Sequence, residues 1–496
     1  MKKYLLLLVT LMTALVLVAC KNGADDKIVI KYAAWNLGSV NDNNIERRMI
    51  KAYEEKNPDV RVEIIERPRI VDEEGNESDA TWDAFFNAQA AIQDMPDVFQ
   101  VDNVVKAVQN EWVSDVYEYA KDDVDFNKIP ENIRNAALYN DKLFALPQAL
   151  FYMGYFINRT VINEKSPSGS ITPVYGMTYP ELMDAAKKNA RAPITGGDGV
   201  VGIDGMNELA LWLSAQQNDT FDWYTYTEGE GYNLDSDEFK NAMIEQQKYF
   251  GATYAEHSAY VLESTNVRYQ KTGDEFWNPN TRFGDGDKFE IGSQAIKWGG
   301  SYNLRNWLGA TVDPNTTLPG LFGADIDFIG TPAVEVEGVK YHKIPVVIDY
   351  IGVGQGTDHP EIAYDFAKWM GFGVDGYLKR LEIAEEFPQA GAVNFAPIVQ
   401  DETLVDAYFE LYPTLVEFKK IVNNHQDFII ESLAKTVPGF VQSRWEGRYD
   451  ENRNIAAMLD LIRDGEVNLE DVIGNINDLA NQYYLEAKAE FEDKIN

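Results

Sequence analysis

Strand-like and helix-like patterns alternate along the chain, and this alternation constrains its fold more than any other feature. Residues 27–35 (KIVIKYAAW) are rich in β-branched and apolar side chains and predict a first strand. Residues 43–56 then place apolar side chains at helical spacing, and this pattern ends at Asn57-Pro58. Residues 60–65 alternate as a second strand. A strand, a helix and a strand in this order open an α/β unit.

The same alternation continues further along the chain. Residues 81–94 predict a helix capped by Thr81, and residues 96–101 predict a third strand. Later segments follow as strand, strand and helix: 291–298, 344–353 and 360–370. The chain is mainly helical from about Leu404. We therefore expect an α/β fold in which a mainly parallel sheet carries helices on both faces.

The first residues predict an export signal. A charged start and an apolar run at 4–18 lead to the box LVAC, which ends at Cys20. This box resembles the cleavage site of bacterial lipoproteins, in which the cysteine is lipidated and becomes the mature amino terminus. We expect 1–20 to be a lipoprotein signal peptide, Cys20 to be the lipidation site and 21–26 to be a tether on the outer face of the cell membrane. A plain signal peptide or an anchor helix with an incidental cysteine is the alternative.

Composition excludes several classes of protein. Cys20 is the single cysteine, so neither an internal disulfide nor a thiolate metal site is expected. The 496-residue chain is too long for one core and predicts two or more lobes. It carries 44 Lys and Arg against 80 Asp and Glu, a net charge of −36. Such a field repels polyanions, so we expect no nucleic-acid partner.

Signatures of catalysis and of metal binding are missing from the sequence. The four histidines are isolated, and there is no GxSxG elbow, Walker loop or dinucleotide-binding glycine motif. Residues 284–287 (GDGD) resemble half of a calcium loop but are out of register with one, so we expect an acidic surface turn. We therefore expect no enzymatic activity, no cofactor and no metal, although two of the many carboxylates could still flank a glycosidic bond.

Aromatic side chains stand next to amides and acids where several predicted strands end. A sugar ring needs an apolar face to stack on and planar polar groups to hydrogen-bond its hydroxyls. Ligands of open α/β sheets gather at strand ends. Core packing is the competing interpretation for any single aromatic. The expected substrate contacts are Trp35, Asn36, Asp102, Asn103, Phe151, Tyr152, Tyr302, Asn303, Asp349 and Tyr350.

Seven short motifs follow one another along nearly the whole chain. They are Tyr53-x4-Pro58-x-Val60-x-Val62, Met95-Pro96-Asp97-Val98, Asn140-Asp141-Lys142-Leu143-x-x-Leu146-Pro147, Tyr155-x-Ile157-Asn158, Thr178-Tyr179-x-Glu181-Leu182, Ala295-Ile296-x-x-Gly299-x-x-Tyr302 and His359-Pro360-Glu361-x-Ala363-x-x-Phe366. In this order and spacing they resemble extracellular solute-binding protein family 1, the maltose-binding-protein-like receptors of carbohydrate ABC transporters.

The resemblance implies a two-lobed, hinge-linked fold of the type II periplasmic-binding-protein kind, with the solute between the lobes. The N-terminal lobe would comprise 27–150 plus 351–397, and the C-terminal lobe 151–350 plus 398–496. The chain would pass between the lobes at three places: 149–152, 346–351 and 394–397.

The resemblance also implies roles for particular residues. Tyr302 falls where the family commonly has a stacking tryptophan, and Trp445 matches another stacking position. Phe151 stands where maltose-binding protein has an acid. The implied function is capture of an oligosaccharide or other neutral sugar by a monomeric, lipid-anchored receptor, which delivers it to ABC permease subunits. The alternatives are a surface lipoprotein glycoside hydrolase and a peptide or polyamine receptor of the same fold.

Three segments exceed the usual length of the family: 72–79, 216–231 and 273–288. The last two are rich in aromatic residues. We expect these segments to form loops that widen the cleft for an oligosaccharide.

Overall fold

The computed structural model describes residues 27–35, 37–38, 43–71, 77–308, 323–424 and 427–495. The expected signal peptide, the tether, the lipidation site Cys20 and the expected contact Asn36 lie outside these residues.

The described residues form an α/β structure. Its strands are β1 (Ile28–Ala33), β2 (Val60–Ile64), β3 (Arg69–Val71), β4 (Glu77–Asp79), β5 (Val98–Val101), β6 (Leu138–Tyr139), β7 (Lys142–Leu143), β8 (Leu146–Asn158), β9 (Val201–Ile203), β10 (Tyr226–Thr227), β11 (Gly231–Tyr232), β12 (Gln294–Gly300), β13 (Ile326–Gly330), β14 (Val334–Val336), β15 (Val339–Tyr341), β16 (Ile344–Val353) and β17 (Phe428–Ile430). Its α-helices are α1 (Ile45–Lys56), α2 (Trp82–Ala91), α3 (Val104–Gln109), α4 (Tyr117–Ala120), α5 (Glu131–Asn135), α6 (Arg159–Glu164), α7 (Tyr179–Asn189), α8 (Leu209–Gln216), α9 (Asp237–Phe250), α10 (Tyr254–His257), α11 (Leu262–Thr272), α12 (Pro279–Phe283), α13 (Leu304–Leu308), α14 (Pro360–Met370), α15 (Val374–Glu386), α16 (Glu402–Leu411), α17 (Val416–Asn424), α18 (Leu433–Thr436), α19 (Ile455–Arg463) and α20 (Leu469–Ile495). Short 3-10 or π-helical turns are η1 (Phe126–Lys128), η2 (Met206–Glu208), η3 (Trp223–Thr225), η4 (Glu275–Trp277), η5 (Ser301–Asn303), η6 (Pro388–Ala390) and η7 (Gln442–Glu446).

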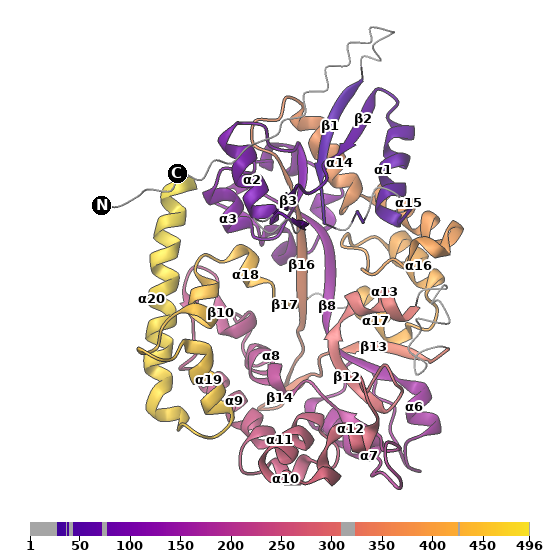
Figure 1. The fold of residues 1–496 in the computed structure, drawn as a ribbon, viewed down its shortest axis with the longest axis vertical. Coiled ribbons are helices and arrows are strands. Elements are labelled where there is room, and N and C mark those ends of the chain that lie inside the picture. The colour runs from indigo at the N-terminus through magenta and orange to yellow at the C-terminus, as the bar shows by residue number, and fades with distance from the viewer. Residues whose placement is uncertain are drawn as a thin grey trace.

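Two long strands, β8 and β16, run through the middle of the molecule and join its upper and lower halves (Figure 1). The first half of β8 pairs antiparallel with the middle of β16. The end of β16 also pairs with β5, while the second half of β8 pairs with β12 and β13. Each strand therefore contributes to the sheet at both ends of the molecule, and together they form the hinge.

The N-terminal lobe is built on β2-β1-β5, in which β1 pairs parallel with both neighbours. Helices α1, α14 and α15 pack together beside it. The apolar face of α1 buries Met49 and Tyr53, and the Tyr53 ring meets Phe366 of α14 with centroids 4.9 Å apart. Phe366 also packs edge-on against Tyr32 of β1. This aromatic cluster fixes the helices on the sheet.

The C-terminal lobe is built on β13-β8-β12-β9, with α7 and α8 among its covering helices. Helix α8 is buried on all sides, as its continuous apolar sequence requires. Its Trp212 is fully buried and stacks on Trp298 of β12, with ring planes 14° apart. Tyr155 of β8 meets both indoles edge-on. Trp298 thus belongs to the lobe's packing.

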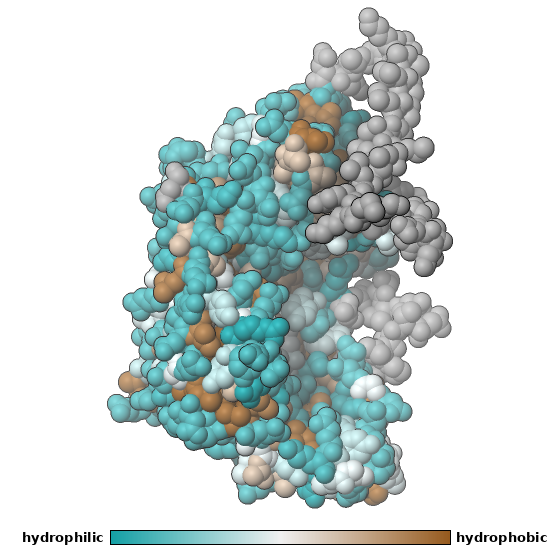
Figure 2. Space-filling view, turned by 60° about the vertical axis from the view of Figure 1, so that its left-hand side comes forward, coloured by the Kyte–Doolittle hydropathy of each residue, from teal (hydrophilic) through white to brown (hydrophobic). Residues whose placement is uncertain are grey.

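The C-terminal helix α20 runs along the flank of both halves (Figure 1, yellow). Asn481 binds the backbone of Tyr232 through two hydrogen bonds of 2.8 Å, which holds the helix to the C-terminal lobe. Near its end, Phe491 packs edge-on against Tyr139 of the β6–β7 hairpin at 4.8 Å. The lobes are therefore joined by α20 as well as by the hinge strands. Figure 2 shows this flank as mostly hydrophilic, with scattered hydrophobic residues.

The expected α/β class is confirmed. Thr81 caps α2 by accepting a hydrogen bond from the amide of Ala84 at 3.2 Å, and the predicted segments 344–353 and 360–370 coincide with β16 and α14. The sheet is parallel in its outer parts and antiparallel around β8 and β16. The reason is that β8 leaves the N-terminal lobe whereas β16 returns to it, so the two strands must run in opposite directions.

Helices α16 and α17 have different packing partners. Helix α16 packs against α15, whereas α17 packs against β13. In the described part of the chain, no helix combines the length and apolar character that a membrane span needs.

Candidate binding site

Several of the expected contact residues meet where the hinge strands pass between the lobes. Phe151 of β8 packs edge-on against Tyr302 of η5 at 5.8 Å and against Phe395 at 6.3 Å. Tyr302 belongs to the C-terminal lobe, whereas Phe395 packs on Tyr377 of α15. Phe151 is nearly buried, but Tyr302 keeps 43% of its surface exposed. A half-open aromatic surface therefore lies at the junction of the lobes.

Local contacts hold Tyr302 in place. The hydroxyl of Ser301 accepts a hydrogen bond from the amide of Tyr152 at 3.0 Å, which ties η5 to the hinge strand β8. Gly300 precedes this turn, and a Cβ atom there would lie only 2.1 Å from the Tyr302 ring. Glycine is therefore required at position 300 for the ring to adopt this position.

Charged side chains from the C-terminal lobe lie near this aromatic surface. The amide of Glu431, directly after β17, donates to the carbonyl oxygen of Val346 at 2.8 Å, which anchors Glu431 to the hinge strand β16. Burial raises the pKa of the Glu431 carboxyl, and Glu208 raises it further, whereas Arg444 and Lys435 oppose the shift. Glu431 therefore lies in the electrostatic field of Arg444, Glu208 and Lys435.

Two aromatic rings, one on η7 and one on η3, lie against the Arg444 guanidinium. Its guanidinium lies over the Trp445 ring at 4.8 Å and over the Tyr224 ring at 5.5 Å. It also lies 3.6 Å from the Glu208 carboxylate. Trp445 itself is 41% exposed, and one edge-on contact with Phe440 fixes its ring. The segment therefore presents an indole face and a cation side by side.

Two of the expected polar contact residues have hydrogen-bond partners on α18. Lys435 of α18 donates to the carboxylate of Asp349 at 2.5 Å and to the carbonyl oxygen of Ile348 at 2.9 Å. Asn103 at the end of β5 caps α3, and its amide donates to the carbonyl oxygen of Ala434 at 3.0 Å. The end of β5 in the N-terminal lobe therefore touches α18 beside Lys435.

Other expected residues lie at the rim or in the core. Trp35, 44% exposed, and Asp102 are exposed at the ends of β1 and β5, and Asn303 is half-buried beside Tyr302. Tyr152 and Tyr350 are buried, 3% and 0% exposed, so neither ring offers a face on which a ligand could stack. Successive side chains of a strand point to opposite faces, and here the neighbours of these tyrosines, Phe151 and Asp349, face the cleft.

The sequence interpretation missed four residues of this region: Glu208, Phe395, Glu431 and Arg444. Glu431 follows the apolar strand β17, so the rule that selected Asp102 at the end of β5 could have found it. Arg444 stands next to the predicted stacking residue Trp445.

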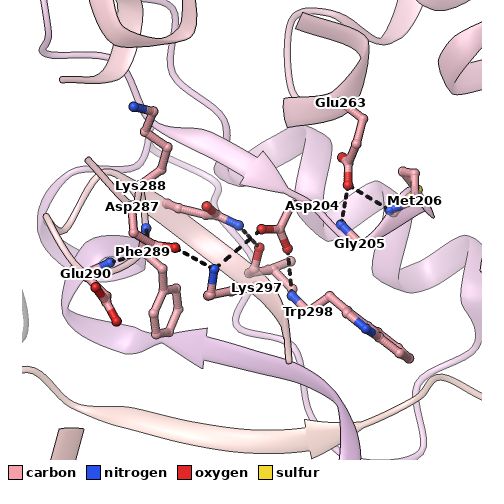
Figure 3. A network of polar contacts seen from close by, with 12 residues as sticks. Asp204, Gly205, Met206, Glu263, Asp287, Lys288, Phe289, Glu290, Lys297 and Trp298 are labelled. Carbon is pink, nitrogen blue, oxygen red and sulfur yellow. Dashed lines mark hydrogen bonds and ion pairs between the residues drawn. The ribbon is translucent and has the colours of Figure 1, made fainter. Parts of the chain in front are cut away.

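The turn that leads to Glu208 is held by buried carboxylates of the C-terminal lobe (Figure 3). One oxygen of Glu263 accepts hydrogen bonds from the amides of Gly205 at 2.6 Å and Met206 at 2.9 Å. Burial raises the pKa of Glu263 to about 8, and the charge of the nearby Asp204 adds to the shift. A carboxyl group that is hard to ionise therefore supports this turn.

The same turn is fixed against the strand that carries Tyr302. Asp204 accepts a hydrogen bond from the amide of Trp298 at 2.6 Å (Figure 3). Gly205 has a left-handed backbone (φ +94°), and a Cβ atom there would lie 2.3 Å from the Cβ atom of Trp298. The turn before Glu208 and the strand before Tyr302 are thus packed directly on each other.

The aromatic side chains of two of the three long segments lie in the C-terminal lobe, and most of the third segment, 72–79, lies outside the described residues. Trp223, Tyr224 and Tyr226 of the segment 216–231 are buried, and the Tyr224 hydroxyl donates to the carbonyl oxygen of Ser443 at 3.3 Å. They support η7 from below. In the segment 273–288, the Trp277 ring packs under two arginine side chains of the C-terminal lobe. The three rings of 216–231 therefore pack inside the lobe, whereas Phe276 of 273–288 stays 54% exposed.

A separate cavity of about 810 Å³ lies beside β17 and α18. Its lining includes Ile430, Leu433 and the end of α20. Asp222 lines it too and accepts a hydrogen bond from the amide of Ile430 at 2.8 Å. Burial raises the pKa of Asp222 to about 6. The cavity therefore adjoins the end of β17, which precedes Glu431.

Comparisons with known proteins agree with this architecture. Residues 39–371 match the family model described as bacterial extracellular solute-binding protein. A search of curated protein sequences finds no match.

Three solved structures cover the chain almost completely. A sugar transporter of Rhizobium etli in an open conformation is 14% identical, with a TM-score of 0.62 over 92% of this chain and 99% of that one. An ABC substrate-binding protein of Listeria monocytogenes in complex with cycloalternan is 16% identical, with a TM-score of 0.56 over 92% and 99%. A cyclic α-maltosyl-1,6-maltose binding protein of Arthrobacter globiformis is 12% identical, with a TM-score of 0.56 over 92% and 99%. At these identities the likeness establishes the fold, which is two-lobed.

Proposed function

The chain belongs to the bacterial extracellular solute-binding protein family, and from this membership we propose that it is the carbohydrate receptor of an ABC importer. In this proposal an oligosaccharide or other neutral sugar binds in the cleft beside Phe151 and is delivered to the permease subunits in the membrane. The cycloalternan bound by the Listeria protein of the same fold supports a carbohydrate as the solute.

One observation carries the proposal. The rings of Tyr302 and Trp445 are each about two-fifths exposed, and charged groups with hydrogen-bonding capacity lie beside them. Sugar rings stack their apolar faces on aromatic rings, and each such contact contributes about 0.5 to 1.5 kcal/mol beyond area burial. The hydroxyls at the edge of a stacked sugar would reach the charged groups.

We propose that the lobes close on the solute by bending β8 and β16. The proposed N-terminal lobe comprises 27–150 and 351–411, and the proposed C-terminal lobe comprises 151–350 and 412–495. The switch of partners along both hinge strands and the packing of α16 and α17 support these limits. Because both hinge strands pass through the contact region, a solute that touches both sides would favour the closed form.

We further propose that the protein acts as a monomer, held by a lipid on Cys20 at the outer face of the cell membrane. The LVAC box supports the anchor. A tether of this kind keeps the receptor near its permease and raises its effective concentration there.

A screen of thermal stability tests the proposed function. The purified protein is heated with neutral oligosaccharides, uncharged peptides or polyamines, and the bound compound is recovered afterwards. A receptor for carbohydrates should be stabilised by an oligosaccharide and return it intact. Release of shorter sugars would point to a glycoside hydrolase, and stabilisation by peptides or polyamines alone would contradict a carbohydrate solute.

A further inference from the structure

A pocket of about 400 Å³ lies within the C-terminal lobe, and its volume falls in the range of small-molecule sites. One face of α11 lines it, with Asn266 and Gln270 one helical turn apart. Gln294, at the start of β12, and Asp204, directly after β9, line it too. None of its lining residues belongs to the aromatic surface at the hinge, so this α11 pocket is separate from that surface.

The charged groups around the α11 pocket are already paired. The ammonium group of Lys288 is buried and donates to the side-chain oxygen of Asn280 at 2.7 Å and to two backbone carbonyl oxygens. Lys297 forms an ion pair with Asp287 at 2.8 Å and lies 3.8 Å from the carboxylate of Asp204 (Figure 3). Two carboxylates and two ammonium groups therefore balance one another. A charged ligand would find no free counter-charge here, which favours an uncharged ligand.

Gln294 leaves one hydrogen-bonding position open in the wall of the α11 pocket. Its side chain is fully buried, and its side-chain nitrogen donates to the carbonyl oxygen of Ile296 at 2.8 Å. Its side-chain oxygen has no hydrogen-bond partner among the residues that the structure describes. Buried polar atoms are normally paired. A ligand hydroxyl that donates to this oxygen would supply the missing partner.

The helix α11 adds further polar groups and an aromatic ring. The side-chain amides of Asn266 and Gln270 form no hydrogen bond with the described part of the chain. An amide group both donates and accepts hydrogen bonds, as a hydroxyl group does. Tyr269 of the same helix lines the pocket with a ring on which an apolar face can stack. Amide groups beside an aromatic ring match a ligand that has several hydroxyls and an apolar face.

We propose that the α11 pocket binds a neutral monosaccharide, or one residue of a longer neutral sugar, at a site separate from the hinge. Gln294 accepts a hydrogen bond from one sugar hydroxyl, while Asn266 and Gln270 bind others. This site goes beyond the proposed function because all of its lining elements lie in the proposed C-terminal lobe. Binding here therefore needs no closure of the lobes.

Nuclear magnetic resonance of side-chain amide groups tests the proposal. The purified protein is titrated with glucose, galactose, mannose and xylose, and with glucuronic acid and glucosamine, which each carry a charge. We expect at least one neutral sugar to shift the Gln294 amide signal in a saturable way and neither charged sugar to do so.

Variants of α11 measure what its amides contribute. The affinity read from the Gln294 signal should fall about 2- to 12-fold in Q270A and about 5- to 150-fold in N266A/Q270A, as expected for loss of one and two hydrogen bonds. Asn241→Ala removes an exposed amide from α9 of the same lobe and should match the unaltered protein. Because Q270A changes only an exposed side chain, its dispersed spectrum should show a folded protein.

A variant of the hinge region separates the two sites. Y302A/W445A should leave the response of the Gln294 signal unchanged, because neither residue lines the α11 pocket. Loss of this response in Y302A/W445A would make the pocket a part of the cleft and overturn a separate site. The proposal also fails if no neutral sugar gives a saturable shift, if a charged sugar binds more tightly than every neutral one, or if N266A/Q270A keeps the full affinity.

Discussion

The rings of Phe151 and Tyr302 meet edge-on with their centroids 5.8 Å apart, so the hinge strand β8 and the C-terminal lobe share one aromatic surface. A change at either residue alters the cleft and the hinge together.

Removal of the exposed rings should weaken carbohydrate binding. We expect Tyr302→Ala and Trp445→Ala each to lower the affinity about 2- to 12-fold, since each lost stack contributes about 0.5 to 1.5 kcal/mol beyond area burial. Titration by intrinsic fluorescence measures this loss. Phe276→Ala removes an exposed ring elsewhere in the C-terminal lobe and serves as the control. Unchanged affinity in both cleft variants would remove these rings from the binding site.

An alanine at position 300 should displace Tyr302. Its Cβ atom would lie 2.1 Å from the ring, so the ring has to move. We expect Gly300→Ala to lower ligand affinity at least as much as Tyr302→Ala and to lower the free energy of unfolding by about 1 to 3 kcal/mol, as overpacking does. Gly196→Ala is the control because an added Cβ atom there meets only one atom, at 3.8 Å. Equal affinity of Gly300→Ala and the unaltered protein would contradict this account.

The buried Glu263 should make stability depend on pH. Its pKa is raised from 4.5 to about 8 in the folded protein, so between these values only the unfolded chain releases the proton. The group therefore stabilises the fold fully below about pH 4.5, and this contribution falls by about 1.4 kcal/mol per pH unit toward pH 8.

Comparison with Glu263→Gln isolates this contribution. The amide oxygen of glutamine can still accept hydrogen bonds from Gly205 and Met206, but glutamine does not ionise. Denaturant unfolding at pH 5 and pH 8 should show the variant gaining stability relative to the unaltered protein as the pH rises. Glu256→Gln, at an exposed glutamate, should show no such gain. A stability difference that is the same at both pH values would refute the raised pKa.

The contact between Phe491 and Tyr139 should stabilise the junction of α20 with the N-terminal lobe. Phe491 is buried, so we expect Phe491→Ala to lower the free energy of unfolding by about 3 kcal/mol or more. Hydrogen exchange should also become faster at the β6–β7 hairpin. Leu485→Ala, at an exposed position of the same helix, should have little effect. Slow exchange at the hairpin in both variants would show that α20 does not secure it.

Replacement of Cys20 by serine should separate attachment from binding. We expect Cys20→Ser to abolish incorporation of labelled palmitate and to release the protein from the membrane fraction. Solution affinity for the carbohydrate should be unchanged, while uptake by cells should fall. Continued membrane attachment of the variant would show that the lipid anchor is not at this cysteine.

Local patterns predicted much of the fold. The segments 344–353 and 360–370 could be predicted because their patterns are local. The first is a long apolar run, and the second is a helical pattern that begins with proline. Thr81 caps α2 as predicted, because a capping hydroxyl needs only its own first turn. The antiparallel course of the hinge strands had no such local signal, since it depends on which lobe each strand leaves.

The candidate site was predictable only in part. Aromatic residues beside polar ones predicted contacts at the hinge. The pattern could not show whether Phe151 or Tyr152 faces the cleft, because alternation along a strand does not say which face meets the other lobe. Glu208, Glu431 and Arg444 come from segments that are far apart in the sequence, so no spacing links them. The segment 216–231 is rich in aromatic residues, as a loop that lines a binding cleft would be. Its sequence could not show that the rings are buried, because the same side chains pack in a core and stack on a sugar.

The position of α20 has a consequence for how the protein is made. Its final turns contact Tyr139 and Lys142 of the N-terminal lobe, and its earlier turns hold the C-terminal lobe. Native contacts between residues this distant in the sequence form only when the last of them is available. A growing chain therefore reaches its complete structure only after α20, its last helix, has been made.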